Sequence, residues 1–349
     1  MLCRLSGRGI KVHLITFEKT ATKLEVREIL FNHGIVWTRL EFGSRGAVAG
    51  LRRLFRLTKA IRDTDLIHAR SDIPALAGLL SRKAPVLWDV RSLWASQRAF
   101  IETNIPRKII FLAVKPLESI CSTYSKGVST LTNAAIEILE RRHRKVPHLR
   151  IVVPTAVDLD RFKLNLEMPT IIRGLFSGTY SNYYDLKKSH AFISALQELQ
   201  EIEIHWARPQ ETEIKALNAG ENHTFEALYS NMAQIIPMFS FGISICKQDA
   251  GPSLTAAMPT KIAEFLASGR PVVVSKGIGD MDTLLAEFKA GIVIDTENDD
   301  FTDKARELLK LLSDSETPKQ CRALAEKYFD IDTGVNNYIN LYRKILNSL

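Results

Sequence analysis

A lysine and a glutamate stand three residues apart in "PTKIAEFLASGRPVVVSKG", residues 259–277. Pro259 predicts the start of a helix, Gly269 predicts its end, and the valines that follow predict a strand. Residues three apart share one face of a helix, so Lys261 and Glu264 present a cation beside a carboxylate. The N–H groups at a helix start bind phosphate, and a carboxylate accepts hydrogen bonds from vicinal hydroxyls. Phosphate and ribose together describe a nucleotide.

An ordinary ion pair between Lys261 and Glu264 on a solvated helix face is the simpler interpretation, and it would contribute about 0.2–0.5 kcal/mol. The proline start and the position of the helix between two strands favour a ligand site instead. In an open parallel sheet, ligands bind beyond the carboxyl ends of the strands, where the strand order reverses. The sequence therefore predicts a site in a crevice at strand ends.

Short apolar strands alternate with helical segments along the whole chain, which predicts βαβ units and parallel sheets. The series restarts after a polar segment at residues 160–170. We therefore expect an α/β protein with two Rossmann-like, doubly wound domains, residues 1–163 and 164–334, facing a central cleft. A final helix at 335–349 is expected to pack back on the first domain. The expected strands are 11–17, 35–40, 65–70, 85–90, 127–132, 150–154, 174–178, 201–206, 241–246, 271–275 and 291–295.

Charge is divided unequally between the two halves. Residues 1–163 hold 29 Lys and Arg against 14 Asp and Glu, a net charge of +15, whereas residues 164–349 hold 18 against 25, a net charge of −7. Such asymmetry is typical of proteins that bind nucleic acid, an anionic membrane surface or an anionic ligand. Nucleic acid is the least favoured partner, because no zinc finger and no continuous basic recognition helix accompanies the charge.

The composition favours a cytoplasmic protein. The four cysteines are widely spaced and form no Cys-x-x-Cys pair, so they indicate neither a zinc cage nor a disulfide framework. The apolar run at residues 109–114 is much shorter than the ~20 residues that a membrane span requires. We also expect no secretory signal.

Residues 259–295 resemble the donor-binding signature of the family 4, retaining glycosyltransferases with the GT-B fold. "VPTAVDLDRF", residues 153–162, is similar to the hinge motif of these enzymes. "HARSDIPALAG" and "WDVRSLWASQR" resemble a bacterial subgroup that builds surface polysaccharides, and the Pro-Thr-Lys variant occurs among such members. The resemblance implies transfer of a sugar from a UDP- or GDP-linked donor to a hydroxyl of a glycan or lipid-linked acceptor. It also implies a retained anomeric configuration, with no catalytic metal and no cofactor.

The resemblance implies roles for single residues. Glu264 is expected to bind the ribose, while Lys261, Thr260 and Gly178 are expected near the diphosphate. Lys187, or its neighbour Lys188, is a further basic candidate. For the segment that contains Gly178 and these lysines, a plain strand-to-helix turn with solvated lysines is nearly as well supported.

Asp89 and Arg91 stand at the end of the expected strand 85–90, where they would face the crevice. There they could orient the acceptor hydroxyl or contact the donor sugar, which makes them the catalytic candidates. A local pair of Asp89 and Arg91 that only shapes the loop is an equally weighted alternative.

The chain departs from the family pattern in two places. Many members carry two glutamates with seven residues between them, but counting back from Glu264 reaches Ala256. The family's first strand and its glycine-rich loop also have no counterpart here, because residues 1–17 match the end of the first helix and the second strand. We therefore expect the first strand of the N-terminal domain to be missing, which would expose a neighbouring strand edge.

Residues 50–62 form a basic amphipathic stretch. Such a helix can lie on an anionic leaflet, which would place the protein at the inner face of the cytoplasmic membrane. It can equally cover a sheet and expose a solvated basic face. The apolar side is expected to hold Leu51, Leu54, Phe55, Leu57 and Ile61, and the basic side Arg52, Arg53, Arg56, Lys59 and Arg62.

Two other functions are compatible with this fold. One is a non-catalytic sugar-nucleotide-binding or scaffold protein that keeps the fold without the activity. The other is an enzyme that acts on the donor alone, such as a sugar-nucleotide epimerase. An epimerase usually carries additional acidic and histidine residues in the crevice, and we find no convincing set in this sequence.

Overall fold

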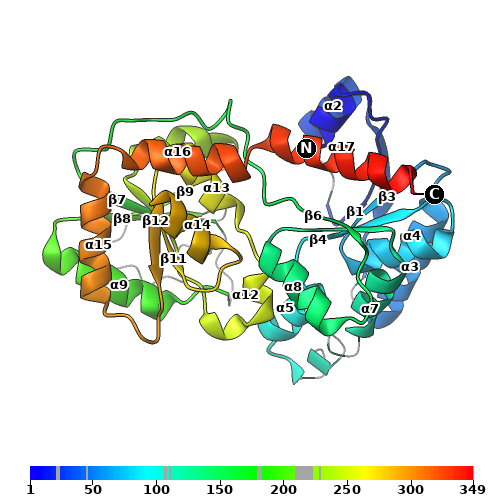
Figure 1. Ribbon diagram of the computed structural model, residues 1–349, viewed down its shortest axis with the longest axis horizontal. Helices are drawn as coiled ribbons and strands as arrows, with labels where there is room; N and C mark the ends of the chain where they lie inside the picture. The colour runs from blue at the N-terminus through cyan, green and yellow to red at the C-terminus, as the bar shows by residue number, and fades with distance from the viewer. Residues whose placement is uncertain are drawn as a thin grey trace.

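The computed structural model describes residues 1–20, 24–44, 46–105, 108–109, 112, 114–178, 183–208, 223–227 and 229–348. Two α/β halves lie side by side along the long axis of the molecule (Figure 1). The strands of each half pair in parallel, as the alternation of strands and helices predicts.

The N-terminal half holds the first six strands and seven of the described helices. The strands are β1 (His13–Glu18), β2 (Val36–Glu41), β3 (Ile67–Arg70), β4 (Val86–Val90), β5 (Gly127–Thr130) and β6 (Leu149–Val152). The helices are α1 (Leu2–Gly7), α2 (Leu24–Asn32), α3 (Ala47–Ala60), α4 (Asp72–Ser81), α5 (Trp94–Ile101), α7 (Pro116–Tyr124) and α8 (Asn133–Arg142).

The C-terminal half holds the other six strands, and a last helix returns to the first half. The strands are β7 (Arg173–Ser177), β8 (Glu203–Arg208), β9 (His223–Glu226), β10 (Phe241–Ser244), β11 (Val272–Ser275) and β12 (Gly291–Ile294). The helices are α9 (Leu186–Leu199), α11 (Met232–Ile235), α12 (Pro252–Thr255), α13 (Thr260–Ala267), α14 (Met281–Phe288), α15 (Phe301–Ser313), α16 (Thr317–Tyr328) and α17 (Ile331–Leu346).

Every strand expected from the sequence is present, with its ends within two residues of the expected ones. The structure also contains a strand, β9, that the sequence did not predict. Its four residues, His-Thr-Phe-Glu, contain no apolar run, and of the strands that the structure describes it pairs with β8 alone, at the edge of the sheet. An edge strand of this length carries too little periodicity to be recognised.

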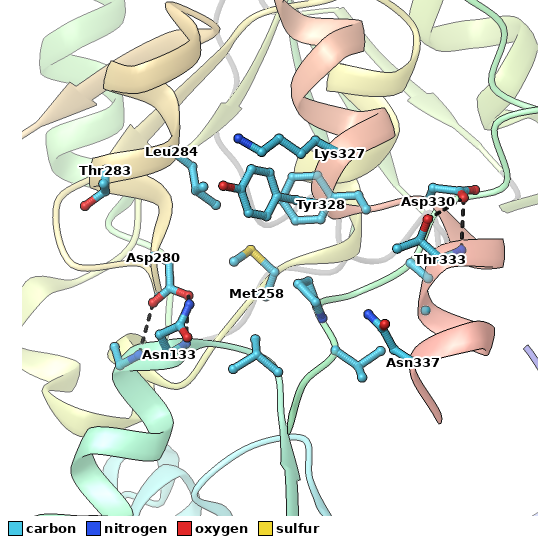
Figure 2. Close-up of a pocket in the computed structure, with 18 of the residues that line it drawn as sticks. Asn133, Met258, Asp280, Thr283, Leu284, Lys327, Tyr328, Asp330, Thr333 and Asn337 are labelled. Carbon is cyan, nitrogen blue, oxygen red and sulfur yellow. Dashed lines mark hydrogen bonds between the residues drawn. The ribbon is translucent and has the colours of Figure 1, made fainter. Parts of the chain in front are cut away.

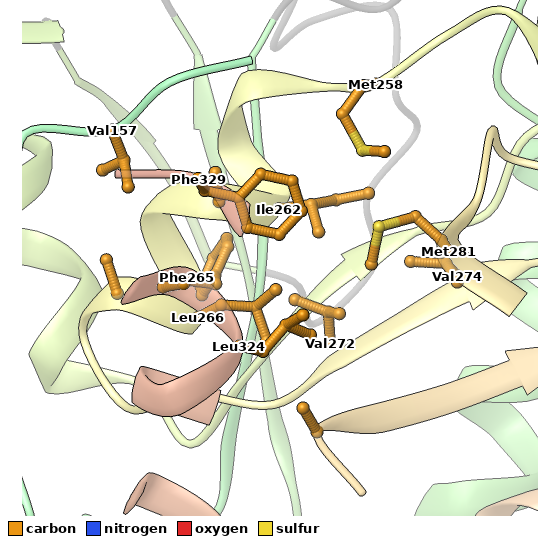
Figure 3. Close-up of a cluster of buried hydrophobic side chains, with 14 of the residues drawn as sticks. Val157, Met258, Ile262, Phe265, Leu266, Val272, Val274, Met281, Leu324 and Phe329 are labelled. Atoms are coloured by element: carbon orange, nitrogen blue, oxygen red, sulfur yellow. The ribbon is translucent and has the colours of Figure 1, made fainter. Parts of the chain in front are cut away.

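The C-terminal sheet is covered by helices on both faces. Its strand order is β12-β11-β10-β7-β8-β9. Helices α9 and α15 supply apolar side chains to one face. Helices α13, α14 and α16 pack on the other, where Phe265 and Leu266 meet Leu324 (Figure 3). Gly242 allows this close approach, since a Cβ atom there would lie 2.6 Å from the Phe265 ring.

The N-terminal half contains a four-stranded sheet, β3-β4-β5-β6, and a separate pair, β1-β2. Helix α17 packs on the four-stranded sheet through Tyr338, Leu341 and Ile345, and Figure 1 shows it above β4 and β6. β1 and β3 form no ladder with each other, although Leu57 of α3 and Ile61, which follows α3, pack in one cluster with side chains of both strands. The strands of the N-terminal half are therefore divided between two separate sheets.

Candidate functional site

The strand order of the C-terminal sheet reverses between β7 and β10, and the predicted lysine lies at that point. Lys261 Nζ donates a 3.3 Å hydrogen bond to the carbonyl oxygen of Ser177, the last residue of β7. The same ammonium group lies 4.1 Å from the centre of the Tyr184 ring. The backbone of Tyr184 forms an isolated antiparallel β-bridge with Cys246, which follows β10. Lys261 is therefore fixed where an open parallel sheet binds its ligand.

Glu264 is buried and has an unusual environment for a carboxyl group. Its residue is only 5% exposed, and within the described part of the chain its Oε1 atom has no hydrogen-bond partner. Burial raises the pKa of Glu264 to about 7, and the positive charge of Arg161 acts in the opposite direction. No ion pair with Lys261 forms among the described side chains, so the simple surface pair considered above is wrong. A buried acceptor without a partner is costly unless a ligand supplies the donor.

The packing of α13 explains how the sequence fixes these two side chains. Pro259 precedes the helix with extended backbone geometry, and the helix begins at Thr260. From Ile262 onward every residue of the helix is buried, whereas Thr260 is exposed and Lys261 is half-buried. The apolar contacts of Figure 3 thus hold the helix against the sheet, and only its N-terminal end meets solvent.

The other residues expected to bind the donor differ in their contacts with the Lys261 site. Gly178 directly follows Ser177 and has φ +101°, a conformation that favours glycine. Lys187 is exposed in the first turn of α9, and the structure shows no contact between its described side chain and Lys261 or Glu264. Lys188 donates instead to the carbonyl oxygen of Thr296, at 2.6 Å. Residues 179–182 of the expected glycine loop lie outside the described residues.

The structure does not place Asp89 as expected. Its side chain is buried beneath α17, where it accepts hydrogen bonds from Ser129 at 2.9 Å and from Tyr338 at 3.2 Å. His68 Nε2 lies 3.4 Å from the same carboxylate, and these contacts hold the pKa of Asp89 below its usual range despite burial. The expectation that Asp89 faces the crevice is therefore wrong, because alternate residues of a strand point to opposite faces of the sheet. Asp89 ties the sheet to α17.

Arg91 follows the end of β4 and is half-buried. Its Nε atom lies 3.9 Å from Asp89 Oδ2 and, among the described residues, has no hydrogen-bond partner. The contact with Asp89 is thus a loose one. A guanidinium group with a free donor suits a ligand oxygen, so the role of Arg91 stays a prediction.

Ala256, where many family members carry a glutamate, is 1% exposed. Although it belongs to the C-terminal half, it packs in an apolar cluster with Val90 and Leu93 of the N-terminal half. Phe100 of α5 also contacts the ring of Tyr183 edge to face, with 5.9 Å between the ring centres. The two halves therefore touch on the side of the site, and a glutamate at 256 would be buried between them.

The sequence did not predict the contacts of two residues, Tyr184 and Asp280. Tyr184 lies under the Lys261 ammonium, in a segment whose aromatic residues gave no signal of that contact. Asp280 binds Asn133 and Ala134 of the other half, although its position just before α14 is typical of an ordinary helix cap. Asp280 also lines a cavity of about 630 Å³ beside the linkers, opposite Asp330, Thr333 and Asn337 (Figure 2).

Residues 1–161 match the profile of Glycosyltransferase Family 4. These residues form a glycosyltransferase family 4 domain. This match, together with the fold, confirms the predicted family 4 resemblance over residues 1–161, whereas the Pro-Thr-Lys subgroup stays a prediction. No curated protein sequence matches the chain.

The glycosyltransferase domain and the half that follows it share their arrangement with solved structures. Sucrose-phosphate synthase from Thermosynechococcus elongatus superposes with a TM-score of 0.72 at 15% identity, over 99% of this chain and 91% of that one. HepE from Anabaena, in complex with UDP and glucose, gives 0.70 at 16% identity, over 100% and 95%. Trehalose 6-phosphate synthase from Burkholderia multivorans gives 0.66 at 12% identity, over 97% and 99%. The expected GT-B fold is thereby confirmed.

Two further properties concern the described part of this glycosyltransferase fold. None of its helices combines the length and apolar character that crossing a bilayer demands. Its His, Cys, Asp and Glu side chains form no group of three or more that could hold a metal ion.

Proposed function

We propose that this protein transfers a sugar from a UDP- or GDP-linked donor to a hydroxyl group of a glycan or lipid-linked acceptor, with retained anomeric configuration. The observation that carries the proposal is the buried carboxylate of Glu264, whose Oε1 atom has no hydrogen-bond partner among the described residues. It lies one helical turn from Lys261, at the point where the strand order reverses. This arrangement belongs to a chain whose first half is a family 4 domain.

The donor binds mainly to the C-terminal half. Glu264 accepts hydrogen bonds from the ribose hydroxyls, which supply the partners that its buried oxygen lacks. The diphosphate lies at the start of α13, near Lys261 and Thr260, and beside the backbone of Gly178. Phosphate at a helix start gains from the free N–H groups and from the helix dipole. In support, HepE of the same fold is described in complex with UDP and glucose.

The chemistry follows from where charge develops. As the bond between the anomeric carbon and the phosphate oxygen breaks, negative charge grows on the leaving diphosphate. Lys261 and the α13 N–H groups are already in place, so they stabilise the transition state more than the ground state. The acceptor hydroxyl forms the new bond on the same face of the sugar and gives its proton to the leaving phosphate oxygen. We propose that Arg91 binds a sugar or acceptor oxygen.

The acceptor side is the basic N-terminal half, and we propose that α3 brings it to an anionic membrane. Leu57 points inward, as expected, but Leu51 and Phe55 do not, since they are 66% and 60% exposed. Val48 is exposed on the same helix, so a solvated basic face alone does not describe it. Exposed apolar side chains interleaved with cations suit an anionic leaflet. The exposed cations of α3 are Arg52, Arg56 and Lys59.

Isothermal titration calorimetry with UDP and GDP tests the donor site. We expect Glu264→Gln and Lys261→Ala each to weaken nucleotide binding about tenfold or more, because each removes a contact to a charged group. Glu307→Gln is the matched control, since Glu307 lies on α15, which covers the opposite face of the sheet. Unchanged affinity in both site variants would show that the assignment is wrong.

Transfer itself is tested separately, by release of UDP or GDP from a sugar-nucleotide panel. Slow donor hydrolysis, or transfer to an added acceptor, supports the enzyme. Tight nucleotide binding without any turnover supports the non-catalytic alternative. The alanine at position 256, where many family members carry a glutamate, favours that alternative.

A further inference from the structure

Asp280 joins the two halves of the molecule through an unusual helix cap. The residue directly precedes α14, yet its side chain forms no cap bond with that helix. Its Oδ2 accepts from Asn133 N at 2.7 Å and from Asn133 Nδ2 at 3.1 Å, while Oδ1 accepts from Ala134 N at 3.1 Å. Figure 2 shows the carboxylate of Asp280 pointing at the start of α8. A carboxylate from one half thus caps a helix of the other.

The start of α8 depends on this contact. Its next N–H, that of Ala135, donates to Thr132 Oγ1 at 3.0 Å, which leaves the first two N–H groups to Asp280. Thr132 Oγ1 also donates to the carbonyl oxygen of Thr255 at 3.1 Å. A negative charge at a helix start is favourable, and its bonds to N–H groups are among the stronger ones. Separation of the halves would therefore leave the α8 N–H groups without their partner.

The contact is linked to the segment that leads into the donor helix. Gly279 N donates to the carbonyl oxygen of Leu254 at 3.3 Å. A Cβ atom at Gly279 would lie 2.6 Å from Thr132 Cγ2 and 2.5 Å from the Ala257 carbonyl oxygen, so the halves meet there without spare room. Thr155 of the hinge motif, residues 153–162, donates to the carbonyl oxygen of Met258, two residues before α13. A displacement of Asp280 would therefore disturb the segment that leads into α13.

We propose that Asp280 is a positioning residue for glycosyl transfer. By capping α8 it fixes the arrangement of the two halves described here, which we call the closed arrangement. When the halves separate, it is placed to cap its own helix, α14. The closed arrangement sets the acceptor half over the donor bound at Lys261 and Glu264. We call the contacts of Asp280 with Asn133 and Ala134 the latch. The effect on glycosyl transfer rests on the proposed function, whereas the latch does not.

The first experiment measures amide hydrogen exchange at the start of α8 together with small-angle scattering. In Asp280→Ala we expect exchange at Asn133 and Ala134 to be about tenfold faster or more, and the radius of gyration to increase. Asp280→Asn keeps an acceptor without the charge and is expected to lie between the two. Exchange and scattering identical to the wild type in both variants would overturn the proposal.

Two glycine variants provide a matched pair. Gly279→Ala forces the tight contact apart and is expected to raise the radius of gyration. Gly277→Ala also places a side chain at a positive φ, +86°, but its Cβ would be 3.9 Å from the nearest heavy atom. It is expected to leave the scattering unchanged. An equal effect of both variants would attribute the change to backbone strain and would contradict the latch.

Kinetics connect the latch to transfer. We expect Asp280→Ala to lower kcat/KM for transfer about tenfold while the Kd of UDP stays within twofold, since the donor contacts lie in the C-terminal half. Absence of both UDP binding and GDP binding in the wild type would refute the proposed function but leave the exchange result valid. Normal transfer by Asp280→Ala with an opened molecule would show that the latch does not position the reaction.

Discussion

Lys261 Nζ lies 3.3 Å from the carbonyl oxygen of Ser177, so the helix that begins at Thr260 is tied to the end of the strand at the point of reversal. The bond holds the ammonium group in place before any ligand arrives. Preorganised charge of this kind contributes to catalysis because it needs no rearrangement as the reaction proceeds. Glu264 is held differently, because it lies on the buried face of α13.

Nucleotide binding should depend on pH through Glu264. Its pKa in the free protein is about 7, and ribose hydroxyls donate to the ionised form. Affinity is therefore expected to be constant well above pH 7 and to fall up to about tenfold per pH unit below it. Calorimetry from pH 5.5 to 8.5 measures this, with Glu264→Gln showing what remains from the nucleotide itself. Superimposable profiles for both proteins would contradict the role of the carboxylate.

Asp72 should make the protein less stable as pH rises. It is buried, its Oδ1 accepts from Trp88 Nε1 at 3.1 Å, and burial followed by the charge of Glu118 raises its pKa to about 7. The folded state then holds the proton more tightly than the unfolded state, so stability is lost between about pH 4 and 7.

The variant Asp72→Asn removes this loss. Its free energy of unfolding, relative to the wild type, should increase between pH 5 and 8 by less than about 4 kcal/mol, as urea denaturation can measure. The exposed Asp63→Asn serves as the control and should show no such trend. A pH-independent difference for Asp72→Asn would refute the raised pKa.

Restoring the family glutamate at position 256 should not restore the family site. Ala256 is buried against the N-terminal half, so Ala256→Glu would place a carboxylate in an apolar contact. We expect a loss of stability of about 2 kcal/mol or more in thermal or urea unfolding, whereas Ala256→Ser should lose less. A stable Ala256→Glu protein with faster transfer would mean that the side chain reaches the donor instead.

Membrane contact through α3 should require both its apolar and its basic residues. Wild-type protein is expected to sediment with vesicles that contain phosphatidylglycerol, less so at high salt, and not with phosphatidylcholine alone. Leu51→Ser with Phe55→Ser, and separately Arg52→Glu with Arg56→Glu, should each weaken binding about tenfold or more. Phe31→Ser removes a side chain that is 82% exposed from α2 and is the control. Equal binding by all four proteins would exclude this surface.

The sequence alone determined the elements and the local part of the site. Alternating strands and helices require only short-range periodicity, and each expected strand is present. The spacing of Lys261 and Glu264 and the proline before them are also local, so their position at a helix start was predictable. The strand β9 escaped prediction because a four-residue edge strand has almost no pattern of its own.

The tertiary structure decided which partner each side chain meets. Asp89 points to α17, Ala256 enters the apolar cluster of the other half, and Asp280 caps a helix 147 positions earlier in the chain. None of these pairings follows from neighbouring residues. They depend on which face of a sheet a helix covers and on how two halves meet, and those are properties of long-range packing that the local sequence does not encode.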